Sequence, residues 1–257
     1  MSPEPVFTGV GVALITLFDD SGDLDAAATA DLAERLVGLG VRAVVVAGST
    51  GEASALNLGE RAELLRAVRA RLPSGGAVLI AGTGAPSARQ AAEFTCSARD
   101  EGADAVLTLS PPGAGDPRPY YQEVAGAAEG LPVLAYHWPA MSAPGIPVAM
   151  LHRLPIAGCK DSSGDPDRLL ETLDAWQGPL YTGSSALLAF AGPMGCAGAI
   201  LALANADPER CIAAFAGDFR AQRDLIPGHL RSIAGFPGGI KRLTAERFGT
   251  STTTRLG

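Results

Sequence analysis

Short apolar runs alternate with helical segments along most of this chain, and this alternation limits the folds that it can adopt. The starts of the runs lie 20 to 35 residues apart, which is room for one strand, one helix and two short loops. None of the runs alternates strictly between polar and apolar residues, as expected of parallel strands buried on both faces. The eight predicted strands begin near Val10, Ala43, Val78, Ala105, Val133, Ile156, Pro179 and Ala199.

Helical periodicity fills the intervals between these strands. Leu32, Leu36 and Leu39 form one apolar stripe, and residues 64–72 contain another. Ser87 precedes an alanine-rich run and predicts a helix N-cap. Eight strand–helix units predict an α/β fold, the (β/α)8 TIM barrel. A doubly wound open sheet ranks second, because the chain has no glycine-rich dinucleotide-binding loop.

Length and composition favour a single domain. A chain of 257 residues, 47% of them hydrophobic, can bury one large core and is too apolar to stay disordered. We expect residues 1–206 to form the catalytic barrel. Residues 207–257 are expected to add the last barrel helix and a short C-terminal helical extension of the same domain. This extension is expected to end in a frayed polar tail, residues 251–257.

Charge and targeting signals narrow the class of protein. With 27 Asp and Glu against 20 Lys and Arg, the formal charge is -7 and no basic stripe is present. We therefore expect neither nucleic acid nor a membrane as a partner. The first residues lack the pattern of a signal peptide. The uncharged run 187–206 has Gly and Pro near its middle, which favours a helix, a turn and a buried strand over a membrane span.

Cysteine and histidine show no spacing typical of a metal site. The four cysteines are widely spread and are expected to be small buried side chains in a reducing compartment, which indicates a cytoplasmic protein. His137 is expected to be a structural histidine that points away from the barrel axis. No carboxylate pair has the arrangement of a two-acid hydrolase.

Lysine is scarce, and its scarcity singles out one residue. Of the 20 cationic residues, 18 are arginine and only Lys160 and Lys241 are lysine. Lys160 closes a predicted strand, which places it at the barrel mouth where active sites lie. A desolvated lysine has a lowered pKa and supplies a nucleophilic amine, whereas arginine cannot form a Schiff base. The structural alternatives are an ion pair with Asp161 or Asp165 and a side chain that simply reaches solvent. Lys241 lies in a late helix and is expected to reach solvent.

Two further polar groups follow other predicted strands. Tyr136 ends the strand before Lys160, so the two side chains can meet above the barrel, where a phenol can shuttle protons. The alternative is an aromatic ring that only fills the barrel top. Residues 48–52 (GSTGE) combine small residues and backbone N–H groups with the hydroxyls of Ser49 and Thr50. This combination suits a carboxylate, and a plain turn is the alternative.

Taken in order, these motifs carry a family resemblance. From ALITLFDDSGDLD through GSTGE, GADAVLTLSPP, YHWP and GCKDSSGD to GCAGAILALAN, the chain resembles the dihydrodipicolinate synthase / N-acetylneuraminate lyase family of class I, pyruvate-handling aldolases. The resemblance covers about residues 9–207. It implies a (β/α)8 barrel in a homodimer or homotetramer, a small 2-keto acid as substrate, and no metal or organic cofactor.

The resemblance also implies roles for individual residues. Lys160 matches the lysine that forms an imine with pyruvate or another 2-keto acid, and Tyr136 matches the tyrosine that relays protons. Ser49 and Thr50 match the hydroxyl pair that holds the keto acid carboxylate. Ser49 is also the relay hydroxyl behind Tyr136. The backbone positions that match the lining of the same pocket are Gly183 and Ile200.

Three departures from the family pattern bear on the substrate. Pro112 and Gly113 replace a Tyr-Tyr pair whose second tyrosine normally reaches a neighbouring subunit's site and completes the relay, whereas residues 120–121 (YY) are expected in the next helix. Met141 stands where true dihydrodipicolinate synthases carry an arginine for the second substrate's carboxylate. Residues 183–186 (GSSA) stand where the neuraminate lyases present acids to sugar hydroxyls.

The sequence therefore predicts a class I aldolase or lyase in which Lys160 forms a Schiff base with pyruvate or a 2-keto acid. The expected reaction is reversible cleavage of a 2-keto-3-deoxy sugar acid or a similar 2-keto-4-hydroxy acid. Two alternatives stay open. The same imine would serve a 4-hydroxy-tetrahydrodipicolinate synthase or a deoxy sugar acid dehydratase. A member without its tyrosine pair would bind keto acids without catalysing a reaction.

Overall fold

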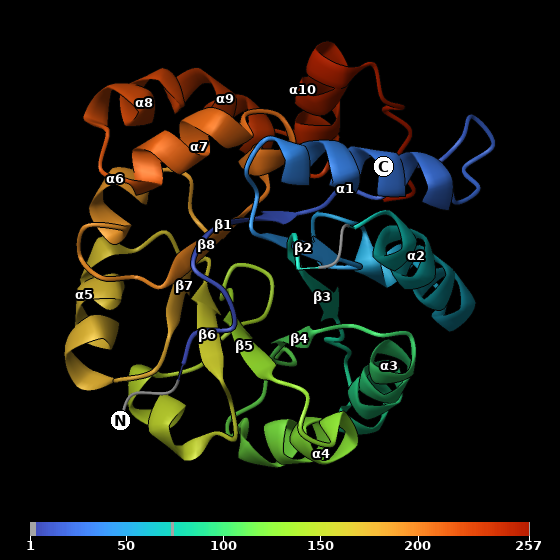
Figure 1. Cartoon of the computed structure of the whole chain (residues 1–257). Coiled ribbons are helices and arrows are strands. Elements are labelled where there is room, and N and C mark those ends of the chain that lie inside the picture. The colour runs from blue at the N-terminus through green and yellow to red at the C-terminus, as the bar shows by residue number, and fades with distance from the viewer. Residues whose placement is uncertain (1–3, 73–74, 257) are drawn as a thin grey trace.

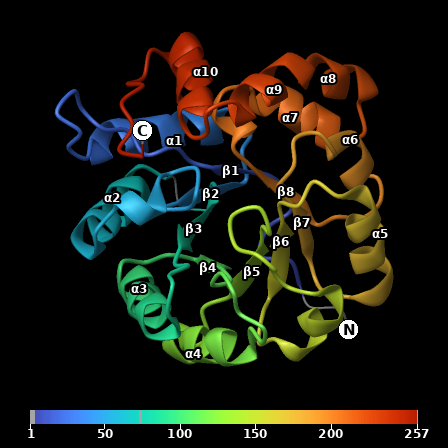
Figure 2. The same ribbon diagram turned by 180° about the vertical axis from the view of Figure 1, so that it is seen from behind.

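Eight parallel strands close into a barrel in which each strand pairs with the next in sequence and β8 pairs with β1. The structure is a computed structural model that describes residues 4–72 and 75–256. Figures 1 and 2 show the strands at the centre and the helices around them. This arrangement confirms the TIM barrel and excludes the open sheet. The strands are β1 Gly9–Ala13, β2 Ala43–Val46, β3 Val78–Gly82, β4 Ala105–Leu109, β5 Val133–His137, β6 Gly158–Asp161, β7 Leu180–Thr182 and β8 Gly198–Leu201.

Helices or helical turns connect the strands. Ser87 caps α3 as expected, because its hydroxyl accepts a hydrogen bond from the Gln90 N–H at 3.2 Å. Between β5 and β6 the structure has the 3-10 segment η2 in place of an α-helix, since Pro139, Pro144 and Pro147 restrict the backbone there. The α-helices are α1 Ala26–Gly38, α2 Leu58–Arg71, α3 Ala88–Asp100, α4 Arg118–Ala128, α5 Pro166–Ala175, α6 Leu188–Ala191, α7 Pro208–Phe215, α8 Phe219–Asp224, α9 Ile226–Ile233 and α10 Gly238–Phe248. The 3-10 segments are η1 Ala53–Ala55, η2 Val148–Arg153 and η3 Leu203–Asn205.

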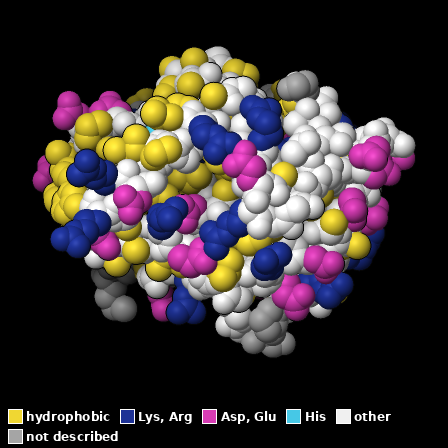
Figure 3. Space-filling view, turned by 90° about the horizontal axis from the view of Figure 1, so that it is seen from above, with side chains coloured by type: hydrophobic (Ala, Val, Ile, Leu, Met, Phe, Trp, Pro, Cys, Tyr) yellow, Lys and Arg dark blue, Asp and Glu magenta, His cyan; other side chains and the backbone are white. Residues whose placement is uncertain are grey.

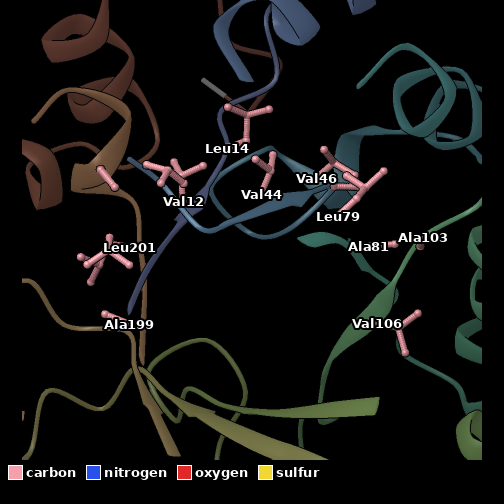
Figure 4. Close-up of a cluster of buried hydrophobic side chains, with 14 of the residues drawn as sticks. Val12, Leu14, Val44, Val46, Leu79, Ala81, Ala103, Val106, Ala199 and Leu201 are labelled. Atoms are coloured by element: carbon pink, nitrogen blue, oxygen red, sulfur yellow. The ribbon is translucent and has the colours of Figure 1, made fainter. Parts of the chain in front are cut away.

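Strand side chains alternate between the barrel interior and the layer beneath the helices. On β2, Val45 belongs to the inner cluster, whereas Val44 and Val46 belong to the outer one. Figure 4 shows part of the outer cluster, with side chains from β1, β2, β3, β4 and β8. Tyr136 belongs to the inner cluster, and its register partner Lys160 shares that face. The alternation therefore aims both side chains at the barrel axis.

The C-terminal tail is ordered against the barrel mouth, so the expectation of a frayed tail is wrong. The backbone N–H groups of Arg255 and Leu256 donate to Glu52 Oε2 at 2.7 and 2.9 Å. The Arg255 guanidinium donates to Gly22 O at 2.7 Å and forms an ion pair with Glu60 at 2.7 Å. A guanidinium carries five donors, and here they bond to oxygens of a turn, of η1 and of α2.

The surface carries one apolar region of note. Phe219 of α8 and Ile226, Leu230 and Ile233 of α9 are more than half exposed. Figure 3 looks onto the side of these helices and shows hydrophobic side chains gathered in its left part. Among the described residues, no helix is both long and apolar enough to cross a bilayer. The run 187–206 instead contains α6, β8 and η3, as expected for a helix, a turn and a buried strand.

Candidate active site

Lys160 and Tyr136 meet at the barrel mouth because β5 and β6 pair in register there. Lys160 is only 5% exposed, and its Nζ lies 4.2 Å from the centroid of the Tyr136 ring. Asp161 faces the other side of β6 and pairs with Arg168 at 2.8 Å. None of the ion pairs within residues 4–72 and 75–256 includes Lys160. Both structural alternatives, a lysine paired with Asp161 or Asp165 and a lysine in solvent, are therefore wrong.

Burial lowers the pKa of Lys160 to about 7. The cause is desolvation of the ammonium group, which favours the neutral amine. Among residues 4–72 and 75–256 no carboxylate forms an ion pair with Lys160, so no such pair restores the charged form. A large fraction of this lysine is therefore a neutral, nucleophilic amine at neutral pH.

This lowered pKa predicts the pH dependence of imine formation. The rate constant with pyruvate is expected to rise about tenfold per pH unit below about pH 6 and to level off above about pH 8, because only the neutral amine adds to a carbonyl. Rapid mixing followed by quenching with borohydride at each pH measures it. A lysine with an ordinary pKa would give a rate that keeps rising towards about pH 10, and that result would contradict the prediction.

Burial and two serine hydroxyls act on the pKa of Tyr136 in opposite directions. Burial raises the pKa of Tyr136, and hydrogen bonds with Ser162 and Ser49 partly oppose that rise. Trp138 stacks on the tyrosine ring with centroids 6.0 Å apart, and Phe236 meets the Trp138 ring edge-on. Tyr136 is therefore a neutral phenol at pH 7, able to donate one proton and to accept another.

The GSTGE loop presents Ser49 and Thr50 to the barrel mouth. Ala47 and Glu52 bracket the loop with φ of 51° and 56°, and this left-handed conformation costs non-glycine residues about 1 kcal/mol each. Gly82 of the GTG motif lies directly against the loop, and a Cβ there would overlap the Ala47 carbonyl group. The GTG motif therefore supports the loop from behind.

A buried ion pair holds the same loop, so the expectation that Lys241 reaches solvent is wrong. Lys241 of α10 and Glu52 are both fully buried, with Nζ 2.5 Å from Glu52 Oε1. The ammonium also donates to Thr253 O at 2.6 Å and lies 4.4 Å from the centroid of the Phe18 ring. The left-handed turn directs the Glu52 carboxylate into the protein, where it requires a cation.

Most of the predicted site residues line one cavity. It has a volume of about 600 Å³ and opens at the C-terminal ends of the strands. Ser49 lines an adjoining cavity of about 440 Å³, and Tyr136 lines both. The five predicted residues in the first cavity are Lys160, Tyr136, Thr50, Gly183 and Ile200. The fold thus brings together all six residues, with Tyr136 between the two cavities.

The cavity also contains residues that the sequence reasoning missed. Ser162 lies two residues after Lys160, and the period of a strand was a signal that could have found it. Ser185 Oγ lies 2.8 Å from Nδ1 of His229, which comes from α9 and has no local sequence signal. His137 is a structural histidine as expected, since its Nδ1 accepts from the Ile146 N–H at 2.8 Å.

Comparison with known proteins agrees with this architecture. The sequence model of the Dihydrodipicolinate synthetase family matches residues 6–224. The chain belongs to this family. Membership confirms the resemblance drawn from the motifs and the prediction of a lyase of the class I aldolase type.

Relatives within the family carry two kinds of name. A Halobacterium salinarum protein named as an uncharacterized DapA-like lyase is 34% identical over 91% of this chain and 79% of its own length. A 4-hydroxy-tetrahydrodipicolinate synthase of Natronomonas pharaonis is 32% identical over 85% of this chain and 79% of its own.

Solved structures of family members share the fold. YagE, a prophage protein from Escherichia coli K12 in complex with pyruvate, superposes with a TM-score of 0.87 at 25% identity, covering 96% of this chain and 91% of that one. Dihydrodipicolinate synthase DapA-2 from Bacillus anthracis gives a TM-score of 0.88 at 26% identity, covering 99% and 93%.

Proposed function

We propose that Lys160 forms a Schiff base with pyruvate or another 2-keto acid, and that the chain uses this imine for reversible aldol cleavage of a 2-keto-3-deoxy sugar acid or a similar 2-keto-4-hydroxy acid. The observation that carries the proposal is the buried Lys160 amine, whose pKa is lowered to about 7, beside the Tyr136 phenol. Family membership and the pyruvate bound to YagE support a keto acid as the ligand.

Imine formation begins with the keto acid carboxylate on the hydroxyls of Ser49 and Thr50. The Lys160 amine then adds to the keto carbon, and Tyr136 donates a proton to the oxygen that develops negative charge. The nitrogen returns a proton to the Tyr136 oxygen, and Tyr136 donates a proton to the new hydroxyl, which leaves as water. A protonated imine and the Tyr136 phenolate remain. This cation is an electron sink next to the bond that must break.

Cleavage moves electrons into that sink. Tyr136 takes the proton of the C4 hydroxyl, the C3–C4 bond breaks, and its electron pair forms an enamine as the aldehyde is released. Protonation of C3 regenerates the imine, which water hydrolyses to pyruvate and the free Lys160 amine. Condensation follows the same steps in reverse.

The remainder of the cavity supports an aldehyde that carries hydroxyl groups. Ser184, Ser185 and His229 line the cavity beyond Lys160 and offer hydrogen-bonding groups. Met141 lies on its rim, 48% exposed, and provides no cation for a second carboxylate. This lining favours the sugar acid over the substrate of a 4-hydroxy-tetrahydrodipicolinate synthase. We retain a homodimer or homotetramer as part of the proposal, and sedimentation measures it.

Borohydride trapping tests the imine. Incubation with pyruvate and borohydride is expected to add one reduced pyruvate to the peptide that contains Lys160, as read by mass spectrometry. Absence of an adduct on folded protein contradicts the imine. An adduct without turnover of any hydroxy-keto acid supports a non-catalytic binder.

A substrate panel separates the enzymatic alternatives. Pyruvate incubated with a series of aldehydes is expected to react fastest with hydroxylated ones. Aspartate semialdehyde as the best acceptor would support the synthase. Loss of water from a deoxy sugar acid without release of an aldehyde would support the dehydratase.

A further inference from the structure

We propose that Ser162 is a further catalytic residue, which passes a proton between the Lys160 nitrogen and the Tyr136 phenol. With Ser49 on the other side of the phenol, the relay of hydroxyls is then complete within one chain. The inference rests on the proposed imine chemistry and names the residue that moves the proton in it.

The backbone directs Ser162 towards the reacting atoms. Its N–H donates to the His137 carbonyl oxygen at 2.9 Å, so the register of β5 and β6 continues past the end of β6. Since strand side chains alternate, Asp161 faces outward and Ser162 returns to the face of Lys160. A Cβ at Gly183 would overlap Ser162 Oγ and lie 3.1 Å from Lys160 Cε. Ser162 Oγ therefore lies close to the end of the lysine side chain.

Tyr136 separates the two serines in space. The phenol is 5% exposed and lines both cavities, while Ser162 and Ser49 are half-buried. Ser162 lines the cavity that contains Lys160, and Ser49 lines the adjoining one. Both hydroxyls lower the pKa of the phenol against the effect of burial. Ser162 is thus the hydroxyl on the side where the imine forms.

The hydroxyls of the other tyrosines in the chain are buried and already hydrogen-bonded to the backbone. The sequence contains four, and apart from Tyr136 they are Tyr120, Tyr121 and Tyr181. Each of these three is at most 5% exposed, and each hydroxyl bonds to a backbone carbonyl of its own fold. None can supply a phenol to its own site or to the site of a second copy. Ser162, directly after β6, shares the cavity of Lys160 with Tyr136.

The relay balances protons during addition. Attack by the amine gives a positive nitrogen and a negative oxygen on the former keto carbon. The nitrogen passes a proton to Ser162 Oγ, Ser162 passes its own to the Tyr136 oxygen, and Tyr136 passes its own to the substrate oxygen. The result is a neutral carbinolamine, and both hydroxyls end as they began.

The test compares Ser162→Ala with Ser163→Ala in the full chain. Ser163 lines the same cavity, but its hydroxyl accepts from the Asp165 N–H at 3.2 Å. Ser162→Ala is expected to lower kcat and the rate constant of imine formation at least about tenfold, with KM for the keto acid within about twofold. Ser163→Ala is expected to leave both within about twofold.

Two variants of equal side-chain shape at position 162, one with and one without a hydroxyl, separate the effect of the hydroxyl from the effect of side-chain volume. Ser162→Thr keeps a hydroxyl and is expected to retain most activity. Ser162→Val introduces a side chain of the same shape as threonine without the hydroxyl, and it is expected to lose as much activity as Ser162→Ala. The rate constant of imine formation is then measured in mixtures of H2O and D2O and plotted against the fraction of D2O. The plot is expected to be curved for the wild type, since several protons move, and linear for Ser162→Val.

Distinct results overturn the proposal. The wild type could give the borohydride adduct while Ser162→Ala and Ser162→Val keep kcat within about twofold. That result would contradict the proton relay through Ser162 and would leave the proposed Schiff base unaffected. A loss confined to KM assigns Ser162 to substrate binding instead. A wild type without any adduct contradicts the proposed function itself.

Discussion

Replacing Lys160 by alanine is expected to abolish the borohydride adduct and to lower kcat/KM by a factor on the order of 10⁴ or more. The amine is the atom that bonds to the substrate, and no other side chain in the cavity can form the imine. Lys160→Arg is expected to be equally inactive, because a guanidinium cannot be deprotonated at accessible pH. Trapping with pyruvate, mass spectrometry and steady-state kinetics measure both effects.

A stability measurement is the control for this loss. Lys160 has a pKa of about 7 in the folded chain, whereas an unfolded lysine titrates near ~10.4. Folding therefore disfavours the ammonium, a cost that is largest below about pH 7 and disappears as the pH rises to about 10. Lys160→Met is expected to be at least as stable as the wild type at pH 7. A variant that unfolds would contradict this account, as would an adduct that persists in Lys160→Ala.

Replacing Lys241 by methionine is expected to lower the free energy of unfolding by about 3–5 kcal/mol, because it leaves the Glu52 carboxylate buried without a cation. Glu52 and Lys241 are both fully buried, and the ammonium also holds Thr253 of the tail. Catalysis is expected to fall as well, since Glu52 ends the loop of Ser49 and Thr50. Urea unfolding monitored by circular dichroism measures the stability.

Two controls show whether the pair itself is responsible. The double variant Glu52→Gln with Lys241→Met removes both charges and is expected to recover a substantial part of the lost stability. Arg66→Met breaks an exposed pair with Glu101 and is expected to cost at most about 1 kcal/mol. A cost for Lys241→Met no larger than that for Arg66→Met would show that the buried pair contributes little.

Much of the fold follows from local patterns. Every strand begins within two residues of its predicted start, because apolar runs at this spacing can be buried only in a parallel sheet covered by helices. The helix between β5 and β6 could not be predicted as a 3-10 segment from apolar periodicity, since three prolines override that pattern.

The sequence alone also determined which lysine lies at the barrel mouth. Lys160 closes a strand, and a strand in a barrel delivers its last residue to the catalytic face. The position of Tyr136 at the barrel mouth could be predicted for the same reason, because Tyr136 lies near the end of the preceding strand. These positions depend only on strand order and on the period of two, and both can be derived from the sequence.

Only the tertiary structure decided the place of the second lysine and of the relay serine. Lys241 belongs to a helix with little apolar bias, and its burial depends on the carboxylate of Glu52, which lies far away in the sequence. The proposed role of Ser162 depends on its neighbours Tyr136, Gly183 and Lys160, which come from three different strands or the loops that follow them. Local patterns determine where a side chain lies along its own element. The partner that it meets in a low-dielectric interior is determined by packing between distant segments.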